Sequence, residues 1–242
     1  MDKRLHGSRI MSWLWIVAVP MMIMITGLPQ STFAEDVKET DQILNQAATT
    51  WQNFMQDPEM SGFRDHVKQA KGVLIMPRLV KGAFLFGLEG GNGVLFVRDD
   101  NTEVWSEPAF YETSTASFGL QAGAESSEAI LVVQTVKGIE SLLSNSVKLG
   151  GDISAAVGSK GSGMEGSTSA NLGKDFVTYS RSKGIFAGAS FEGASIRTRD
   201  DLNKAYYGSE VRPTDIVVVR KIEANPRSKP LREAVVSAAG GK

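Results

Sequence analysis

Short apolar runs separated by turn-forming residues organise the centre of the chain. Each run is rich in Val, Leu, Ile and Phe and is too short for a helix, so the pattern predicts strands. The runs are Val73–Met76, Ala83–Leu88 and Val94–Val97. Pro77-Arg78 and the GGNG sequence at 90–93 separate them, and Gly and Asn accept the positive φ of tight hairpin turns. We therefore expect a β-meander in the core, with Arg78 and Lys81 at its first turn.

Helical spacing characterises the segment before the meander. Between Glu35 and Gln56, apolar residues recur three and four positions apart and form one stripe along a helix. These residues are Leu44, Ala47, Ala48, Trp51, Phe54 and Met55. Acidic residues crowd the first turns, where they favour the positive end of the helix dipole. A second helix is expected from Gly62 to Lys71, with Ser61 as its N-cap.

The pattern after the meander alternates short strands with short helices. The expected strands are Glu103–Ser106, Phe110–Glu112, Ser117–Ala122, Ala129–Thr135, Phe176–Arg181 and Ile185–Arg197. The expected helices are Val136–Ser144, Asp200–Tyr207 and Leu231–Ala239, and Ile216–Val219 is a last apolar run. The small-residue segment Gly150–Gly173 fits either closely packed strands or a loop.

This order of elements predicts an α+β fold. Short strands joined by Gly-rich turns, without the helical crossovers that parallel pairing needs, favour antiparallel pairing. We expect a mainly antiparallel, bent sheet or barrel-like core with helices packed outside.

The first 34 residues read as a cleaved export signal. Lys3, Arg4 and Arg9 precede an apolar stretch, and Thr32-Phe33-Ala34 places small residues where a signal peptidase cuts. An uncleaved anchor is the alternative, because the stretch is nearly long enough to span a bilayer. We expect a signal peptide at 1–34, a single domain at 35–242 and a periplasmic or secreted protein.

Composition narrows the classes of function. Of 242 residues 42% are hydrophobic, which suits one domain with a substantial core. The formal charge of −1 lacks the basic surplus of nucleic-acid-binding proteins. There is no Cys, so disulfides, thiolate metal sites and a cysteine nucleophile are excluded.

Enzymatic motifs are missing or out of context. After residue 34 His66 is the sole histidine, and we expect it on the surface of a basic helix. The GxGxxG match at 161–166 lacks a preceding buried strand and a following helix. The sequence predicts no enzyme, no catalytic residue, no metal and no cofactor.

Two basic clusters stand out on this weakly acidic chain. The first contains Arg64, Lys68, Lys71, Arg78 and Lys81, and the second contains Arg220, Lys221, Arg227, Lys229 and Arg232. Either cluster could bind an anion, although solvated charged faces explain most such runs.

Several blocks of the sequence resemble the SYLF domain family. They are AKGVLIMPRLVKGAFLFGLEGGNGVLFVRD at 70–99, WSEPAFY at 105–111, SFGLQAGAESSE at 117–128, DFVTYSRSKGIFAGASFEGASI at 175–196 and NKAYYG at 203–208. They occur in the family's order between about Ile43 and Ile216. The resemblance implies a non-catalytic lipid-binding module, whose eukaryotic members bind phosphoinositides and in some cases bundle actin.

The resemblance and the basic clusters together define an expected function and site. We expect association with anionic lipid or a membrane surface, and no contact with nucleic acid or, for an exported chain, with actin. The alternative is an envelope structural or interaction protein that binds a protein partner. The expected anion site comprises Lys68, Lys71, Arg78, Lys81, Arg181 and Lys183, and the C-terminal cluster is the next candidate.

Overall fold

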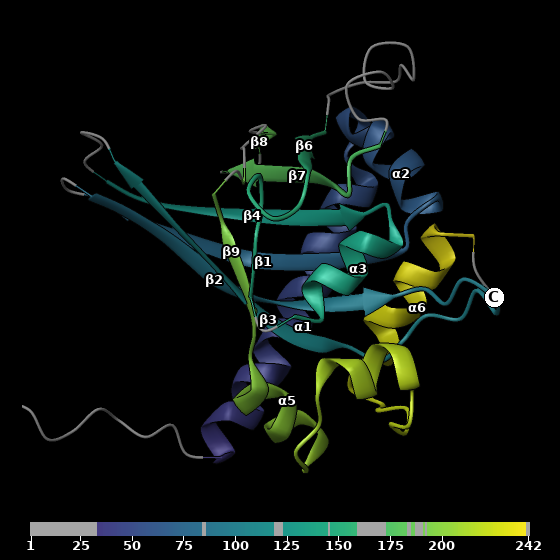
Figure 1. Ribbon diagram of the computed structural model, residues 1–242. Coiled ribbons are helices and arrows are strands. Elements are labelled where there is room, and N and C mark those ends of the chain that lie inside the picture. The colour runs from purple at the N-terminus through teal and green to yellow at the C-terminus, as the bar shows by residue number, and fades with distance from the viewer. Residues whose placement is uncertain are drawn as a thin grey trace, which may run out of the picture. The chain divides into compact units, whose positions relative to one another are not determined.

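The computed structural model describes a sheet with helices on both of its faces (Figure 1). The described residues are 33–83, 86–118, 123–144, 146–158, 173–182, 185–186, 191 and 193–240. The expected signal peptide therefore lies outside them, apart from Phe33 and Ala34, which form the start of the first helix.

The two N-terminal helices follow the amphipathic pattern. Helix α1 spans Phe33–Gln56, a short 3-10 turn η1 spans Pro58–Met60, and helix α2 spans Ser61–Lys68. The expected capping role of Ser61 was wrong, because Ser61 is the first residue of α2 and Met60 precedes it without a side-chain cap. Asp57 instead accepts a hydrogen bond from the Glu59 amide and caps η1.

The predicted three-stranded meander is a hairpin of two long strands. Strand β1 spans Gly72–Ala83 and β2 spans Phe86–Val97, and they pair antiparallel along their length. Pro77-Arg78 is not a turn but an irregularity inside β1, where the register to both neighbouring strands shifts. Proline has no N–H for a ladder bond and is tolerated within a sheet at such bulges.

The GGNG sequence was also wrongly assigned to a turn, because it lies in the middle of β2. A Cβ built on Gly91 would overlap the carbonyl oxygen of Arg78, and one on Gly93 would overlap the carbonyl oxygen of Ile75. These glycines therefore serve close approach of β2 to the irregular part of β1. Positive φ, the basis of the hairpin prediction, is found at neither of them.

The next two strands are longer than the apolar pattern indicated. Strand β3 spans Ala109–Phe118 and joins the expected Phe110–Glu112 and the start of Ser117–Ala122; residues 119–122 lie outside the described parts. Strand β4 spans Gly123–Val133 and contains most of the expected buried run. Glu103–Ser106 is not a strand and contributes only the isolated bridge between Arg98 and Trp105.

The remaining elements are short. They are α3 (Val136–Leu142), β5 (Ser146–Lys148), β6 (Ala155–Val157), β7 (Phe176–Ser182), β8 (Ile185–Phe186), β9 (Ser195–Thr198), α5 (Asp200–Tyr207), the π-helix η2 (Asp215–Val219) and α6 (Lys229–Ala238). The expected strand at 185–197 is thus two strands, and the run at 216–219 is helical. Of the segment 150–173, residues 150–158 form a turn and β6, and 159–172 lie outside the described residues.

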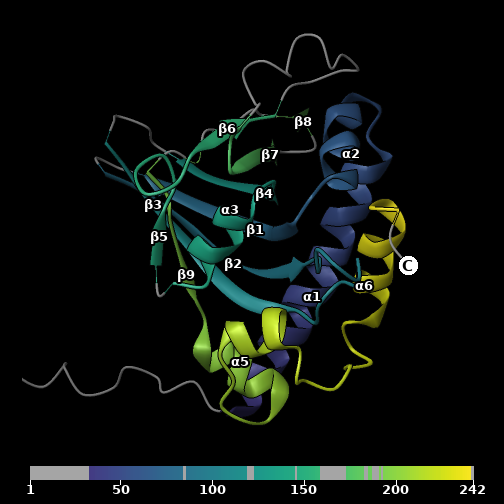
Figure 2. The same cartoon turned by 45° about the vertical axis from the view of Figure 1, so that its right-hand side comes forward.

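The sheet is mainly antiparallel, as predicted. Its strand order is β5-β9-β3-β2-β1-β4-β7-β6, with β8 paired to β7, and among the described strands only β6 and β7 pair in parallel. The sheet is curled, and α1, α2 and α6 lie on one side of it while α3 lies on the other (Figure 2).

Alternate residues of the long strands feed two cores. Ile75 and Phe96 point toward α1 and α2, where they pack with Trp51 and Phe63. Leu74 and Leu95 point to the opposite face, with residues of α3, β5, β9 and η2. Because successive strand residues face opposite sides, continuous apolar runs fit strands that are covered on both faces.

Candidate functional site

The first cluster of cations does not converge. Lys71 directly precedes β1, whereas Lys81 is its tenth residue. At a rise of about 3.3 Å per residue, the two residues stand about 30 Å apart. Lys68 and Lys71 therefore lie at one end of the hairpin, and Arg78 and Lys81 lie toward the other.

Lys68 and Lys71 have acidic partners close by. The Lys68 ammonium is 3.1 Å from Asp65, and that of Lys71 is 2.6 Å from Asp100. The Lys71 carbonyl oxygen accepts from the Arg98 amide at 2.8 Å, which places Arg98 beside them. These side chains are half exposed to exposed, except that of Arg98, which is 18% exposed.

Arg78 borders a different hollow. A cavity of about 350 Å³ separates α1 from the irregular part of the hairpin, and Arg78 lines it with Glu39, Gln42 and Gln46. Arg78 is exposed and has no ionic partner among the described residues.

Arg181 forms largely buried ion pairs within the fold. Its guanidinium lies 3.1 Å from Glu128 and 3.6 Å from Asp57, and all three side chains are at most 20% exposed. Glu128 also accepts from Thr50 of α1 at 2.7 Å. Arg181 thus ties β7 to β4 and α1, away from any shared rim with Lys71. Lys183 lies outside the described residues.

The C-terminal cluster is likewise distributed among separate contacts. Arg227 donates to Asp41 and lies over the Tyr206 ring, and Arg232 pairs with the buried Glu107. Arg220 donates to the carbonyl oxygens of Val104 at 2.7 Å and Val97 at 3.2 Å. These cations fasten the C-terminal segment to α1, α5 and the end of β2.

The contacts of Arg220 bring exposed valines and cations to one edge of the domain. Val104, Val218 and Val219 are 45–51% exposed. Val218 and Val219 directly precede Arg220. The Arg220 guanidinium donates hydrogen bonds to the carbonyl oxygens of Val104 and of Val97, the last residue of β2. We call this surface the valine edge; it comprises Val104, Val218, Val219, Arg220, Lys221, Arg98, Lys68 and Lys71.

The apolar members of this surface escaped the sequence pattern. Val218 and Val219 belong to the last apolar run of the sequence, 216–219, in which only Ile216 and Val217 are buried. The π-helical geometry turns the second half of the run outward. Val104 falls in the expected strand at 103–106, where the structure has only the isolated bridge of Trp105 to Arg98.

His66 is not the surface residue that was expected. It is half-buried, and its Nδ1 lies 2.6 Å from the Tyr179 hydroxyl and 2.9 Å from the Gly62 carbonyl oxygen. Burial lowers the pKa of His66 below its ordinary 6.5, against smaller opposing effects of the Gly62 hydrogen bond and the Asp65 charge.

The lowered pKa predicts acid sensitivity of the fold. At a pH between the lowered pKa of the folded state and the ordinary value of 6.5, His66 binds a proton more readily in the unfolded chain than in the folded chain. The free energy of unfolding therefore falls as the pH drops below about 6.5, and above that pH this effect of His66 is absent. His66→Gln is expected to lose less unfolding free energy than the parent between about pH 7.5 and 5.5. Urea unfolding at both pH values measures this difference; equal losses in the two proteins would contradict it.

Two further findings concern the described parts of the chain. No group of three or more His, Asp or Glu side chains in them is placed to hold a metal ion. No helix there has the length and apolar character needed to cross a bilayer.

The described residues thus form a curled sheet covered by helices, with exposed valines and charged side chains along one edge. The family described as "Ysc84: Las17-binding protein actin regulator" matches residues 114–238, just over half of the chain. The chain belongs to this family, the SYLF family that the sequence blocks resemble.

Curated relatives agree with the assignment. LAS seventeen-binding protein 3 of Saccharomyces cerevisiae is 32% identical over 179 residues, which is 72% of this chain and 38% of that protein. Protein YSC84 of the same yeast is 30% identical over 177 residues, covering 72% and 37%. Human SH3 domain-containing YSC84-like protein 1 is 29% identical over 152 residues, covering 62% and 44%.

The matched stretch spans less than half the length of each of these relatives. The family's description is that of a binding and regulatory protein, which agrees with a non-catalytic role. Because that description names actin regulation, it gives no support to the expectation that actin is excluded.

Proposed function

We propose that this chain is a non-catalytic binding protein that associates with anionic lipid at a membrane surface through the valine edge. One observation carries the proposal: three exposed valines lie next to two cations. The valines are Val104, Val218 and Val219, and the cations are Arg220 and Lys221. Apolar side chains that enter the headgroup region next to cations that attract anionic lipid are the two components of interfacial binding.

The charge balance of this edge limits its electrostatic contribution. Each Lys or Arg near an anionic leaflet contributes about 1 kcal/mol. Lys68, Lys71 and Arg98, however, each pair with a carboxylate, and Asp99 lies close enough to Arg220 to interact with it. We therefore expect the valines to supply much of the affinity and the cations to supply the preference for anionic lipid.

Vesicle flotation of the mature chain tests the proposal. We expect binding to vesicles of phosphatidylcholine with phosphatidylglycerol, and weaker binding to phosphatidylcholine alone. Lys68→Gln with Lys71→Gln should weaken binding about tenfold, because two attractive charges are lost at the valine edge. Replacing Val104, Val218 and Val219 by Ser should weaken it at least as much.

The matched control is Arg78→Gln with Lys81→Gln, which removes the same charge from the other end of β1. If this pair abolishes flotation while the Lys68 and Lys71 pair does not, the hollow beside Arg78 is the lipid site. Equal binding of the valine variant and the parent would contradict the valine edge.

A protein partner is the second candidate, favoured by relatives that are named as Las17-binding. A surface with exposed valines and mostly paired charges also suits a protein interface. Ionic strength separates the two: binding to anionic lipid should weaken as salt rises, whereas an interface with an apolar centre should be little affected.

Export is part of the same proposal, since the N-terminal pattern is that of a secretory signal. Protein recovered after export should have the intact mass of a chain that begins at Glu35. A full-length mass in the membrane fraction would indicate an anchor instead.

A further inference from the structure

The curled sheet ends in two short strands that are joined at one point. Strands β5 and β6 are its two ends, and the turn between them forms a bridge from Leu149 to Ile153. The Gly150 amide donates to the Ile153 carbonyl oxygen, and the Leu149 amide donates to that of Ala194. Beyond this turn, β6 has no strand on its outer side among the described residues.

The hydrogen bonds of β6 show which backbone groups face outward. Two hydrogen bonds join this segment to its parallel partner β7. The Phe176 amide donates to the carbonyl oxygen of Ser154, and the Gly158 amide donates to that of Thr178. Backbone groups in a strand alternate in direction, so the groups of Ala155 and Val157 point away from β7. Two N–H and two C=O groups therefore face the outer edge of β6.

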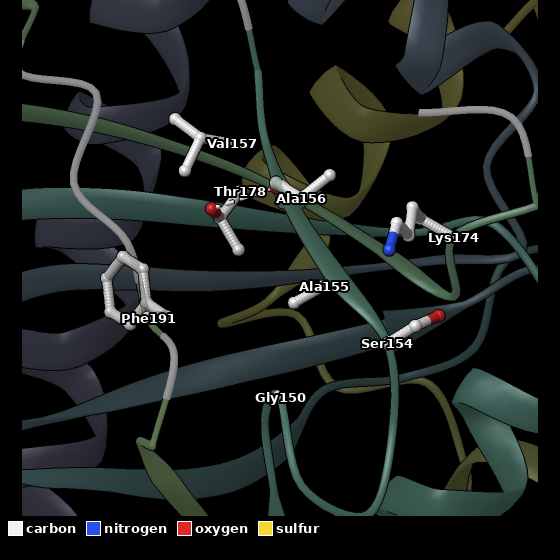
Figure 3. Close-up of a pocket in the computed structure, with 8 residues that line it drawn as sticks. All are labelled: Gly150, Ser154, Ala155, Ala156, Val157, Lys174, Thr178 and Phe191. Carbon is white, nitrogen blue, oxygen red and sulfur yellow. Dashed lines mark hydrogen bonds between the residues drawn. The ribbon is translucent and has the colours of Figure 1, made fainter. Parts of the chain in front are cut away.

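A cavity borders β6 and the neighbouring strand β7. It has a volume of about 320 Å³ and is lined by Gly150, Ser154, Ala155, Ala156, Val157, Lys174, Thr178 and Phe191. In Figure 3, Phe191 and Lys174 lie on opposite sides of β6, and the amino group of Lys174 extends toward this strand. Lys174 is half-buried and has no carboxylate partner among the residues that the structure describes.

We propose that this edge binds an extended, acidic peptide, which adds a strand beside β6 and places a carboxylate on Lys174. This activity goes beyond the proposed association with lipid and uses a different surface. An unpaired sheet edge is a template for strand addition, with main-chain hydrogen bonds giving affinity and neighbouring pockets giving specificity.

The chemistry of the lining favours a peptide over an apolar ligand. The outward groups of Ala155 and Val157 need donors and acceptors at strand spacing, which a lipid tail does not offer. Gly150 has no side chain and Ala155 and Ala156 carry only methyl groups, which leaves room for a second backbone to approach. Lys174 then sets the preference for an Asp or Glu side chain or a C-terminal carboxylate.

The experiment uses a random linear peptide library panned against the full chain, followed by synthesis of the enriched peptides. We expect enriched sequences that are free of Pro at their centre and carry an acidic group. Amide hydrogen exchange of the complex should show new protection at Ala155 and Val157, because their N–H groups become bonded. Gly158, already bonded to Thr178, should change little.

Variants make the test specific. Lys174→Glu should weaken peptide binding at least tenfold by charge reversal, and Val157→Pro should weaken it similarly by removing an outward N–H that β7 does not use. Lys229→Gln, at an exposed lysine of α6, should bind like the parent.

Three outcomes would overturn the proposal. They are a library that yields no peptide above background, peptides that bind the Lys174→Glu and Val157→Pro variants as they bind the parent, and protection that falls outside β6. Displacement of the selected peptide by oleate, without protection at Ala155 and Val157, would show instead that the cavity takes an apolar acid.

Discussion

Gly91→Ala is expected to lower the free energy of unfolding by about 3 kcal/mol, the upper part of the range for overpacking in a filled site. The added Cβ would overlap the carbonyl oxygen of Arg78, a backbone atom that cannot rotate away. Relief requires β1 and β2 to separate in the middle of the sheet, where each also pairs with another strand. Urea unfolding followed by circular dichroism measures the loss.

Gly151→Ala is the matched control. A Cβ there would meet its nearest neighbour, the Lys148 side chain, at 3.8 Å, an ordinary contact distance. Its unfolding free energy should match that of the parent within about 0.5 kcal/mol. Gly91→Asn sharpens the comparison, because a hairpin turn would accept Asn whereas the strand interior would not. If the Gly91→Asn protein is as stable as the parent, the result would support the hairpin turn that the sequence predicted at 90–93.

Arg181→Met is expected to cost about 3–5 kcal/mol, the range for removing one member of a buried ion pair. The change leaves Glu128 and Asp57 largely buried without the positive charge that they share. It also removes the guanidinium from above the Phe54 ring, 5.8 Å from its centroid. Thermal or urea unfolding detects a loss of this size directly.

Lys229→Met provides the comparison for Arg181. The Lys229 pair with Glu233 is 3.8 Å long and exposed on both sides, so its loss should change stability by less than about 0.5 kcal/mol. If Arg181→Met keeps the parent's stability but loses vesicle binding, Arg181 is a ligand residue, as its place in the family block suggested. Loss of stability in Arg181→Met but not in Lys229→Met would assign it to the framework.

The expected anion site shows why spacing along a chain is a poor guide to convergence. Lys71, Arg78 and Lys81 are near neighbours in sequence, and a turn at Pro77-Arg78 would have folded them together. The strand continues through that point by means of an irregular register, so proximity in sequence becomes separation along one strand. Pro77 signals an interruption of the ladder, but a bulge and a turn satisfy that constraint equally well.

The sequence by itself determined the elements whose periodicity is long or whose termini are marked. The apolar stripe of α1 predicted a helix at 35–56, and the structure has it at Phe33–Gln56. The helix at Asp200–Tyr207 was predicted to the residue, with Gly208 following in the left-handed conformation that ends helices well. The α+β class followed from the same signals, since local pattern fixes which residues must be covered on one face or two.

Only the tertiary structure decided what the glycines, the cations and the exposed valines do. A glycine in GGNG has the same letter whether it supplies positive φ or room for a neighbouring carbonyl oxygen, and the neighbour comes from another strand. Arg181 reads as a charge near a strand end until Glu128 and Asp57, more than 50 positions away, enclose it. Val104 meets Arg220 across 116 positions, and contacts of that separation depend on the whole fold, which no local window of sequence contains.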